Sequence, residues 1–189
     1  MARNDDRRRA LADAGLEVLA DAGARGLTHR AVGRAAGVPL GTTTNYFRSR
    51  SALLTGLMER IHERLAPSDD FVAQRAGLPP SRDLFAEYLR NIVDRLMANR
   101  DVTIALFELR LEGIRRPEVA EIIGEQRRSG FAVDVAFNEQ AGLPGSAREI
   151  ALFHYAVDGL LLDQLTGPLL PGVPLDDIVN ALVDGLLPG

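Results

Sequence analysis

The stretch THRAVGRAAGVPLGTTTNYF, residues 28–47, holds two short helical patterns separated by a turn. Two helices can cross steeply over a three- or four-residue turn only if the first presents a small residue to its partner. The turn itself needs a residue that tolerates a positive φ angle. Gly33 and Gly37, which are four residues apart, meet these two demands. The stretch therefore predicts a helix-turn-helix.

The outward positions of the second helix carry unusual side chains. Thr43 and Phe47, one helical turn apart, are predicted to face inward. Thr is a poor helix former because its branched Cβ loses rotamer freedom, so packing must hold this helix. The positions left pointing outward are Leu40, Thr42, Thr44, Asn45 and Tyr46. Short hydroxyls, an amide and a phenol can donate hydrogen bonds to phosphates or base edges in a major groove of DNA.

Helical periodicity also dominates the rest of the chain, and no alternating strand pattern is convincing. Residues 66–81 contain Pro67, Gly77, Pro79 and Pro80 and are predicted to be a connector. Helices are predicted at 4–23, at 28–36, from 39, and at 50–65, 83–99, 102–112, 117–140, 147–165 and 176–187. We therefore expect an all-α fold of about nine helices, in which a three-helix module precedes a larger helical part.

Charge is distributed unevenly along the 189 residues. Residues 1–64 hold 11 Arg against 7 acidic residues, whereas the remainder holds 11 Arg against 19 acidic residues. A basic end on an acidic body fits a module that docks on phosphates, although chance would also produce such a difference. The chain has no Cys, begins with charged residues and lacks an apolar run long enough to span a membrane. We expect a cytoplasmic protein without a membrane partner.

Residues 28–54, THRAVGRAAGVPLGTTTNYFRSRSALL, resemble the helix-turn-helix signature of the TetR (tetracycline repressor) transcription regulators. The matching features are the opening Thr, Ala-Gly-Val at the turn, Gly-Thr, an aromatic residue before Phe, and a final Ser, basic residue and Leu-Leu. The resemblance implies a DNA-binding domain at 1–49 and a ligand-binding and dimerisation domain at 50–189, with helix 50–65 connecting them. It also implies a repressor that a small apolar or amphipathic effector releases from a palindromic operator.

The resemblance further implies which residues contact double-stranded DNA. Arg30 is expected to read a guanine, and Arg50 is expected to clamp a phosphate. Thr44 and Thr43 stand where the family usually has Tyr and Leu, and Arg48 would compensate for the phosphate contact that is lost. The full expected set is Thr28, His29, Arg30, Leu40, Thr42, Thr44, Asn45, Tyr46, Arg48 and Arg50. Residues 7–9, all Arg, are either a solvated helix face or an arm for the minor groove.

The last two predicted helices carry apolar stripes with glycines that allow close helix approach. Paired about a two-fold axis, they would form a four-helix interface of a homodimer, as in the resembled family. The alternative is that the stripes face the core of their own chain. The expected interface residues are Leu152, Ala156, Gly159, Leu160, Ile178, Ala181, Leu182 and Gly185. Such a dimer would place its two recognition helices about 34 Å apart, one turn of DNA.

Large apolar side chains between the connector and these helices are candidates for an effector cavity. The named candidates are Tyr88, Ile92, Phe107, Ile123, Phe131 and His154. Large apolar side chains at helical spacing usually belong to a plain core, so that interpretation stays open. His154 and Asp158 lie four residues apart and could form an ion pair, contact an effector or lie in the dimer interface.

The sequence contains no pattern that favours catalysis. There is no nucleophile elbow, no glycine-rich phosphate loop and no His pair at metal-ligand spacing. We therefore expect no enzyme activity, no metal site and no cofactor. The alternative function is a helical protein-interaction module that does not bind DNA, although such a module would not need a basic N-terminal part.

Overall fold

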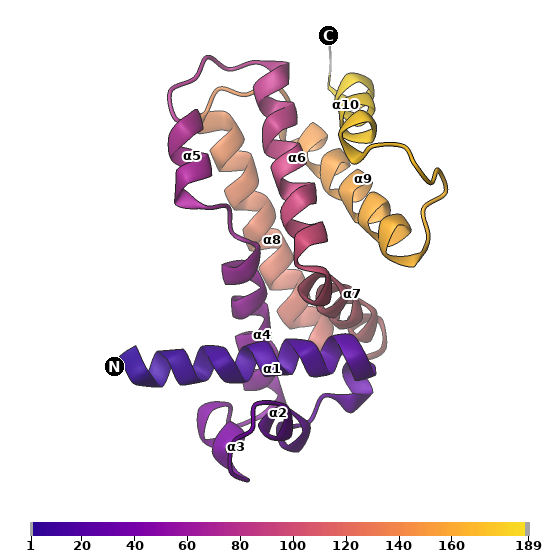
Figure 1. The fold of residues 1–189 in the computed structure, drawn as a ribbon. Coiled ribbons are helices and arrows are strands. Elements are labelled where there is room, and N and C mark those ends of the chain that lie inside the picture. Colours follow the sequence, from indigo (N-terminus) through magenta and orange to yellow (C-terminus); the bar gives the residue numbers. More distant parts are fainter. Residues whose placement is uncertain (1, 188–189) are drawn as a thin grey trace. The chain divides into compact units, whose positions relative to one another are not determined.

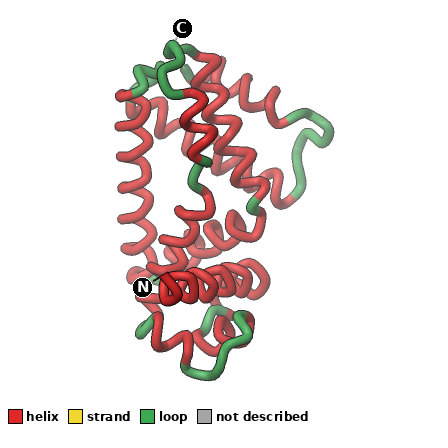
Figure 2. Tube along the Cα trace, turned by 60° about the vertical axis from the view of Figure 1, so that its left-hand side comes forward, coloured by secondary structure: helices red, strands yellow, loops and turns green. Residues whose placement is uncertain are grey.

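A computed structural model describes residues 2–187, and within this range it contains only helices and loops (Figure 2). The described part has ten helices: α1 (Ala2–Gly26), α2 (His29–Ala35), α3 (Thr42–Tyr46), α4 (Arg50–Leu65), α5 (Asp69–Arg75), α6 (Arg82–Ala98), α7 (Arg100–Arg115), α8 (Pro117–Gln140), α9 (Ala147–Thr166) and α10 (Leu175–Leu186). The predicted all-α fold is confirmed.

The chain divides into two compact units. Unit 1 consists of Met1–Ala66 and Asn99–Gln126, and unit 2 consists of Pro67–Ala98 and Arg127–Gly189. Helix α8 therefore contributes its first part to unit 1 and the rest to unit 2. Among residues 2–187, no helix has the length and apolar character that crossing a bilayer requires.

Unit 1 is built around α1, which packs against α2, α4 and α7 (Figure 1). Its core contains fully buried leucines from three helices, among them Leu16 of α1, Leu57 of α4 and Leu109 of α7. Phe47, which follows α3, is 1% exposed and lies directly against Gly56 of α4. Because a side chain at position 56 would collide with this ring, the glycine allows α4 to pack closely on the small helices.

Unit 2 packs α6 against α9 and α10. The rings of Phe85 in α6 and Phe153 in α9 lie 4.9 Å apart between centroids. Arg82 donates hydrogen bonds to the carbonyl oxygens of Val183 and Leu187, at 3.0 and 3.3 Å. These bonds tie α6 to the C-terminal end of α10, where the Val183 carbonyl also accepts from the N–H of Leu187 at 3.1 Å.

Helix α5 lies inside the segment that the sequence predicts to be a connector, so that prediction is wrong for residues 69–75. Ser68 caps the helix because its side chain accepts a hydrogen bond from the backbone N–H of Phe71. Asp69 and Asp70, expected in a loop, form the first turn, where carboxylates interact favourably with the helix dipole. The nearby prolines and glycine, which are typical of loops, favoured the prediction of a connector over that of a short helix.

Candidate functional sites

The helix-turn-helix forms as the two glycines predict. Gly33 faces α3, where an added Cβ would lie 3.1 Å from Oγ1 of Thr43, and Gly37 has a φ of 63°. Thr28 caps α2 by accepting a hydrogen bond from Ala31 N at 3.0 Å. The N–H of Val38 donates to the carbonyl of Gly33 at 3.0 Å and closes the turn.

The recognition helix starts later than the sequence predicts. A helix from about residue 39 was expected, but residues 39–41 form a turn in which Thr42 N donates to the carbonyl of Pro39 at 3.1 Å. Gly41 has a φ of 87°, a left-handed conformation that ends this turn and precedes α3. Only the five residues Thr42–Tyr46 are helical in α3. Leu40 therefore lies in the turn that precedes α3 and not on the helix.

The outward face of α3 is exposed. Leu40 is 88% exposed, and Thr44 and Asn45 are also exposed. Thr42 and Tyr46 are half-buried, and Tyr46 packs partly against the core of unit 1. Three residues are thus fully available to a partner on this face, and two contribute to packing as well.

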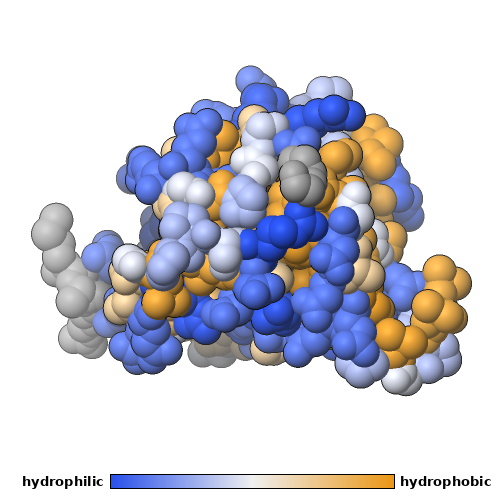
Figure 3. All heavy atoms as spheres, turned by 90° about the horizontal axis from the view of Figure 1, so that it is seen from above, coloured by the Kyte–Doolittle hydropathy of each residue, from blue (hydrophilic) through white to orange (hydrophobic). Residues whose placement is uncertain are grey.

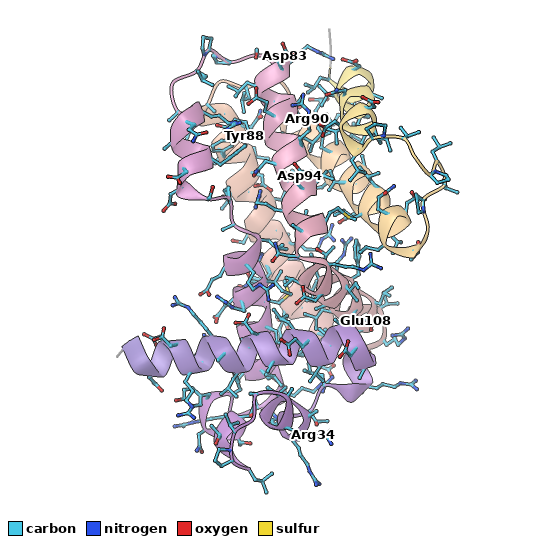
Figure 4. The ribbon with its side chains drawn as sticks, in the orientation of Figure 1. Arg34, Asp83, Tyr88, Arg90, Asp94 and Glu108 are labelled. Atoms are coloured by element: carbon cyan, nitrogen blue, oxygen red, sulfur yellow. The ribbon has the colours of Figure 1, made fainter. Side chains whose placement is uncertain are left out.

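Arginines lie beside this face. Arg30 and Arg34 of α2 line a hollow of about 450 Å³ together with Leu40 and Thr44. Figure 4 shows Arg34 at the surface of α2. Arg34 is not among the residues predicted to contact DNA, although its position four residues after Arg30 places both side chains on one helix face. The hollow joins cationic and apolar side chains, the combination that can contact phosphates and base edges.

His29 connects α2 to the end of α3. Its Nε2 lies 2.7 Å from the carbonyl oxygen of Phe47. Because a carbonyl only accepts hydrogen bonds, Nε2 carries the proton in this contact. His29 therefore fixes the position of the recognition helix relative to α2, and its DNA contact stays a prediction.

Arg50 points into unit 1. Its Nη1 donates to the carbonyl of Leu27 at 2.7 Å, and its Nη2 donates to the carbonyl of Ala24 at 3.0 Å. Its buried Nε has no hydrogen-bond partner among the described residues. Arg50 thus ties the start of α4 to the end of α1 and the α1–α2 turn, and the expected phosphate contact stays a prediction.

Two of the three N-terminal arginines form ion pairs with α4. Arg8 Nη2 lies 2.8 Å from Glu59 Oε2, and Arg9 Nε lies 3.3 Å from Glu63 Oε2. The Arg8 guanidinium also lies 5.3 Å from the centre of the Phe47 ring. These contacts favour a solvated, ion-paired helix face over an arm for the minor groove. Arg48, which follows α3, is exposed, and its phosphate contact stays a prediction.

Thr43 carries a buried hydroxyl without a hydrogen-bond partner among the described residues. The side chain is 2% exposed, and leaving such a group unpaired costs about 1–3 kcal/mol. We expect Thr43→Val, which keeps the shape and removes the hydroxyl, to raise the free energy of unfolding by about 1 kcal/mol. Urea unfolding followed by circular dichroism would measure it, and an equal or lower stability would contradict the expectation. Thr44→Val, at an exposed position, is the control.

The expected interface residues lie away from the core of unit 2. Helix α9 buries Ile150, Phe153, Val157 and Leu161, and α10 buries Val179 and Val183. The expected residues of α9 and α10 are instead half-buried or exposed: Leu152, Ala156, Gly159, Leu160, Ile178, Ala181, Leu182 and Gly185. The half-buried members pack partly within their own chain, so the alternative of an intrachain role stays open, and their role in a dimer stays a prediction.

The same surface holds apolar side chains that the sequence analysis missed. Tyr155 is 65% exposed and Leu162 is 50% exposed, at helical spacing from Gly159. In the loop after α9, Leu169 is 86% exposed. Figure 3 shows orange surface at its lower right, on the side where the loop after α9 lies in Figure 1. Added Cβ atoms at Gly159 and Gly185 would meet no atom within 4 Å, so another helix could approach closely.

The six expected effector residues divide between the two units. Tyr88, Ile92, Phe131 and His154 lie in unit 2 and are half-buried. Phe107 and Ile123 lie in unit 1, where Ile123 is 5% exposed and belongs to the core. The structure therefore gives Ile123 a packing role, and the four residues of unit 2 stay candidates.

His154 and Asp158 each contact α8. His154 Nε2 lies 3.0 Å from Asp134 Oδ2, and its ring lies 5.7 Å from that of Phe131. Asp158 Oδ2 lies 3.5 Å from Arg127 Nη2. These pairs connect α9 to α8 within unit 2, which supports a structural role for both residues.

Several solved structures are similar to this chain over nearly its whole length. A TetR family member from Streptomyces coelicolor A3 is 27% identical with a TM-score of 0.72, covering 97% of this chain and 99% of that chain. The multidrug binding protein EbrR complexed with ethidium is 26% identical with a TM-score of 0.69, covering 97% and 99%. No curated protein matches.

Two family models match the chain. Residues 11–57 match the bacterial regulatory proteins of the tetR family, a range that includes the complete helix-turn-helix. Residues 80–189, more than half of the chain, match the tetracyclin repressor-like C-terminal domain. The buried inner face of the helix-turn-helix, its exposed outer face and these matches agree, and the chain belongs to the TetR family of DNA-binding transcription regulators.

Proposed function

We propose that this regulator is a repressor that binds a palindromic DNA operator as a homodimer, through α2 and α3 of each protomer. The observation that carries the proposal is the exposed face of Leu40, Thr44 and Asn45 beside Arg30 and Arg34. Apolar groups can contact the thymine methyl, Arg can pair with guanine, and Asn can pair with adenine in a major groove. The basic N-terminal part would attract the phosphates.

The surface of α9 and α10 supports the homodimer. A pair of helices with open glycines and exposed Tyr155 and Leu162 offers the apolar, small-residue face that a second copy would cover. A two-fold axis through such a face repeats each recognition helix once, so the preferred DNA site would be a palindrome.

A small molecule bound in unit 2 is the proposed release signal. EbrR, similar to this chain over nearly its whole length, has been solved in complex with ethidium. We propose an apolar or amphipathic effector that contacts unit 2 and changes the position of α4. Release requires that the effector prefer the conformation that does not fit DNA, because equal affinity for both conformations would shift nothing.

A mobility-shift titration tests the DNA proposal. The probe is the DNA upstream of the protein's own coding region, and a scrambled duplex of equal length serves as control. A repressor should bind the upstream DNA preferentially and lose affinity steeply as salt rises. Equal binding to both duplexes, or no binding at low salt, would contradict the proposal and favour the protein-interaction module.

Arg30 and Arg48 should have different effects on DNA recognition. We expect Arg30→Ala to relax the preference at one base pair per half-site by about 1–3 kcal/mol, because a bidentate base contact is lost. Arg48→Ala should weaken all sequences alike and reduce the salt dependence by about one phosphate contact. Binding of single-base variants of the operator measures both effects. Indistinguishable profiles would show that Arg30 does not read a base.

A further inference from the structure

Helix α5 is attached to unit 2 by few contacts. None of its residues is buried, and its two flanking segments contain Gly77 with a φ of 82° and three prolines. Segments with few buried apolar contacts open at low free-energy cost. Residues 66–68 alone separate α5 from α4 in sequence.

The contacts between α5 and α6 include those of one aromatic ring and one cation of α5. The ring of Phe71 meets Tyr88 of α6 edge-on, with centroids 5.6 Å apart and an interplanar angle of 81°. Tyr88 in turn meets Phe137 of α8, with centroids 5.1 Å apart and an angle of 77°. Figure 4 shows Tyr88 on α6 near α5.

Arg75 places a positive charge on the same ring. Its guanidinium carbon lies 3.8 Å from the centre of the Phe71 ring, and its Nε donates to Oε2 of Glu87 at 2.9 Å. Helix α5 thus presents a flat ring with a stacked cation to Tyr88 and Glu87, and Tyr88 in turn contacts Phe137. A planar aromatic cation would present the same combination of groups in a single molecule.

We propose that Tyr88, Phe137 and Glu87 form a binding site for planar aromatic cations, and that Phe71 and Arg75 occupy this site in the unliganded protein. The inference rests on the proposed function, in which unit 2 receives the effector. A ligand would stack on Tyr88 and Phe137, pair with Glu87 and displace α5. Phe137 is 40% exposed and the Glu87 side chain is 41% exposed, so a ligand reaches both without opening the core.

Phe71 and Arg75, by occupying the site, lower its apparent affinity for a ligand. A site that is open for only a fraction of the time binds more weakly by that fraction. Removing the ring and the cation of α5 should therefore tighten ligand binding, whereas an ordinary structural contact would give no such gain. A gain in ligand affinity when Phe71 and Arg75 are removed therefore distinguishes an occupied site from a patch of packed side chains.

The test is a fluorescence titration of the full chain with proflavin near neutral pH, without DNA. The double variant Phe71→Ala, Arg75→Ala should bind proflavin about tenfold more tightly than the unmodified chain. Adding Glu87→Gln or Tyr88→Leu to that variant should weaken binding about tenfold. Val72→Ala, also half-buried on α5, is the matched control and should leave binding unchanged. Acridine, a planar ring system of the same size that is uncharged at this pH, should be insensitive to Glu87→Gln.

Hydrogen exchange provides the second measurement. Proflavin should speed exchange at the amides of residues 69–75 in the unmodified chain, because the ligand displaces α5. An equal or weaker affinity in the double variant, or unchanged exchange with proflavin bound, would overturn the inference. Circular dichroism verifies that each variant is folded. DNA binding is measured separately by the mobility shift. A shift with the upstream DNA but none of the proflavin effects would refute only this inference. The proflavin effects without a DNA shift would refute only the proposed repressor function.

Discussion

Phe47→Ala is expected to lower the free energy of unfolding by about 3–5 kcal/mol, as usual for a buried aromatic ring cut to a methyl group. Phe47 is 1% exposed, closes α3 and fills the space that Gly56 leaves on α4. Without the ring, α3 loses its main anchor, and five helical residues are too few to hold a helix alone. Urea unfolding measures the stability, and a mobility shift with the operator should show binding lost at concentrations that saturate the unmodified protein.

The matched control is Phe71→Ala, which removes the same ring from the half-buried face of α5. It should cost much less stability and leave operator binding without effector intact. A loss of unfolding free energy at Phe47 no greater than that at Phe71 would show that the ring does not anchor the recognition helix. Phe47→Leu should give an intermediate loss because it keeps part of the apolar volume.

Gly159→Arg is expected to convert the dimer to monomers and weaken operator binding by at least about a hundredfold, the usual gain from linking two binding modules. A Cβ at this position meets no atom within 4 Å in the protomer, so the substitution should not disturb the fold of its own chain. Against a closely packed second helix, the same side chain would be sterically excluded and would bury a charge. Analytical ultracentrifugation measures the oligomeric state.

Gly130→Arg provides the matched control, because Gly130 is also helical and its added Cβ also meets no atom within 4 Å. It lies on α8, outside the surface of α9 and α10, and should leave the dimer unchanged. A Gly159→Arg protein that sediments as a dimer would contradict the assigned interface. Thermal unfolding of both variants verifies that neither substitution unfolds the protomer.

Interactions close in sequence could be predicted from the residues alone. The cap at Thr28 and the positive φ at Gly37 depend on neighbours within one turn, and Gly33 faces Thr43 only ten residues further along the chain. The apolar stripe of α9 is likewise visible as a helical period. The all-α fold and the family follow from these local patterns.

Roles that depend on distant partners could not be predicted. Arg50 bonds the carbonyls of Ala24 and Leu27, and His29 bonds the carbonyl of Phe47. Nothing at positions 29 or 50 encodes these partners, because each lies 18 to 26 residues away. Helix α5 was not predicted for a related reason, because its contacts with Tyr88 and Glu87 of α6 cannot be read from the sequence.

The sequence by itself thus determined the all-α fold and most of its helices, the helix-turn-helix and the kind of surface that α3 presents, but it missed α5 and the start of α3. The tertiary structure decided which polar groups are available to a partner and which are used in packing. The physical reason is that helix formation and capping depend on near neighbours, whereas the surroundings of a side chain depend on segments that meet only after folding.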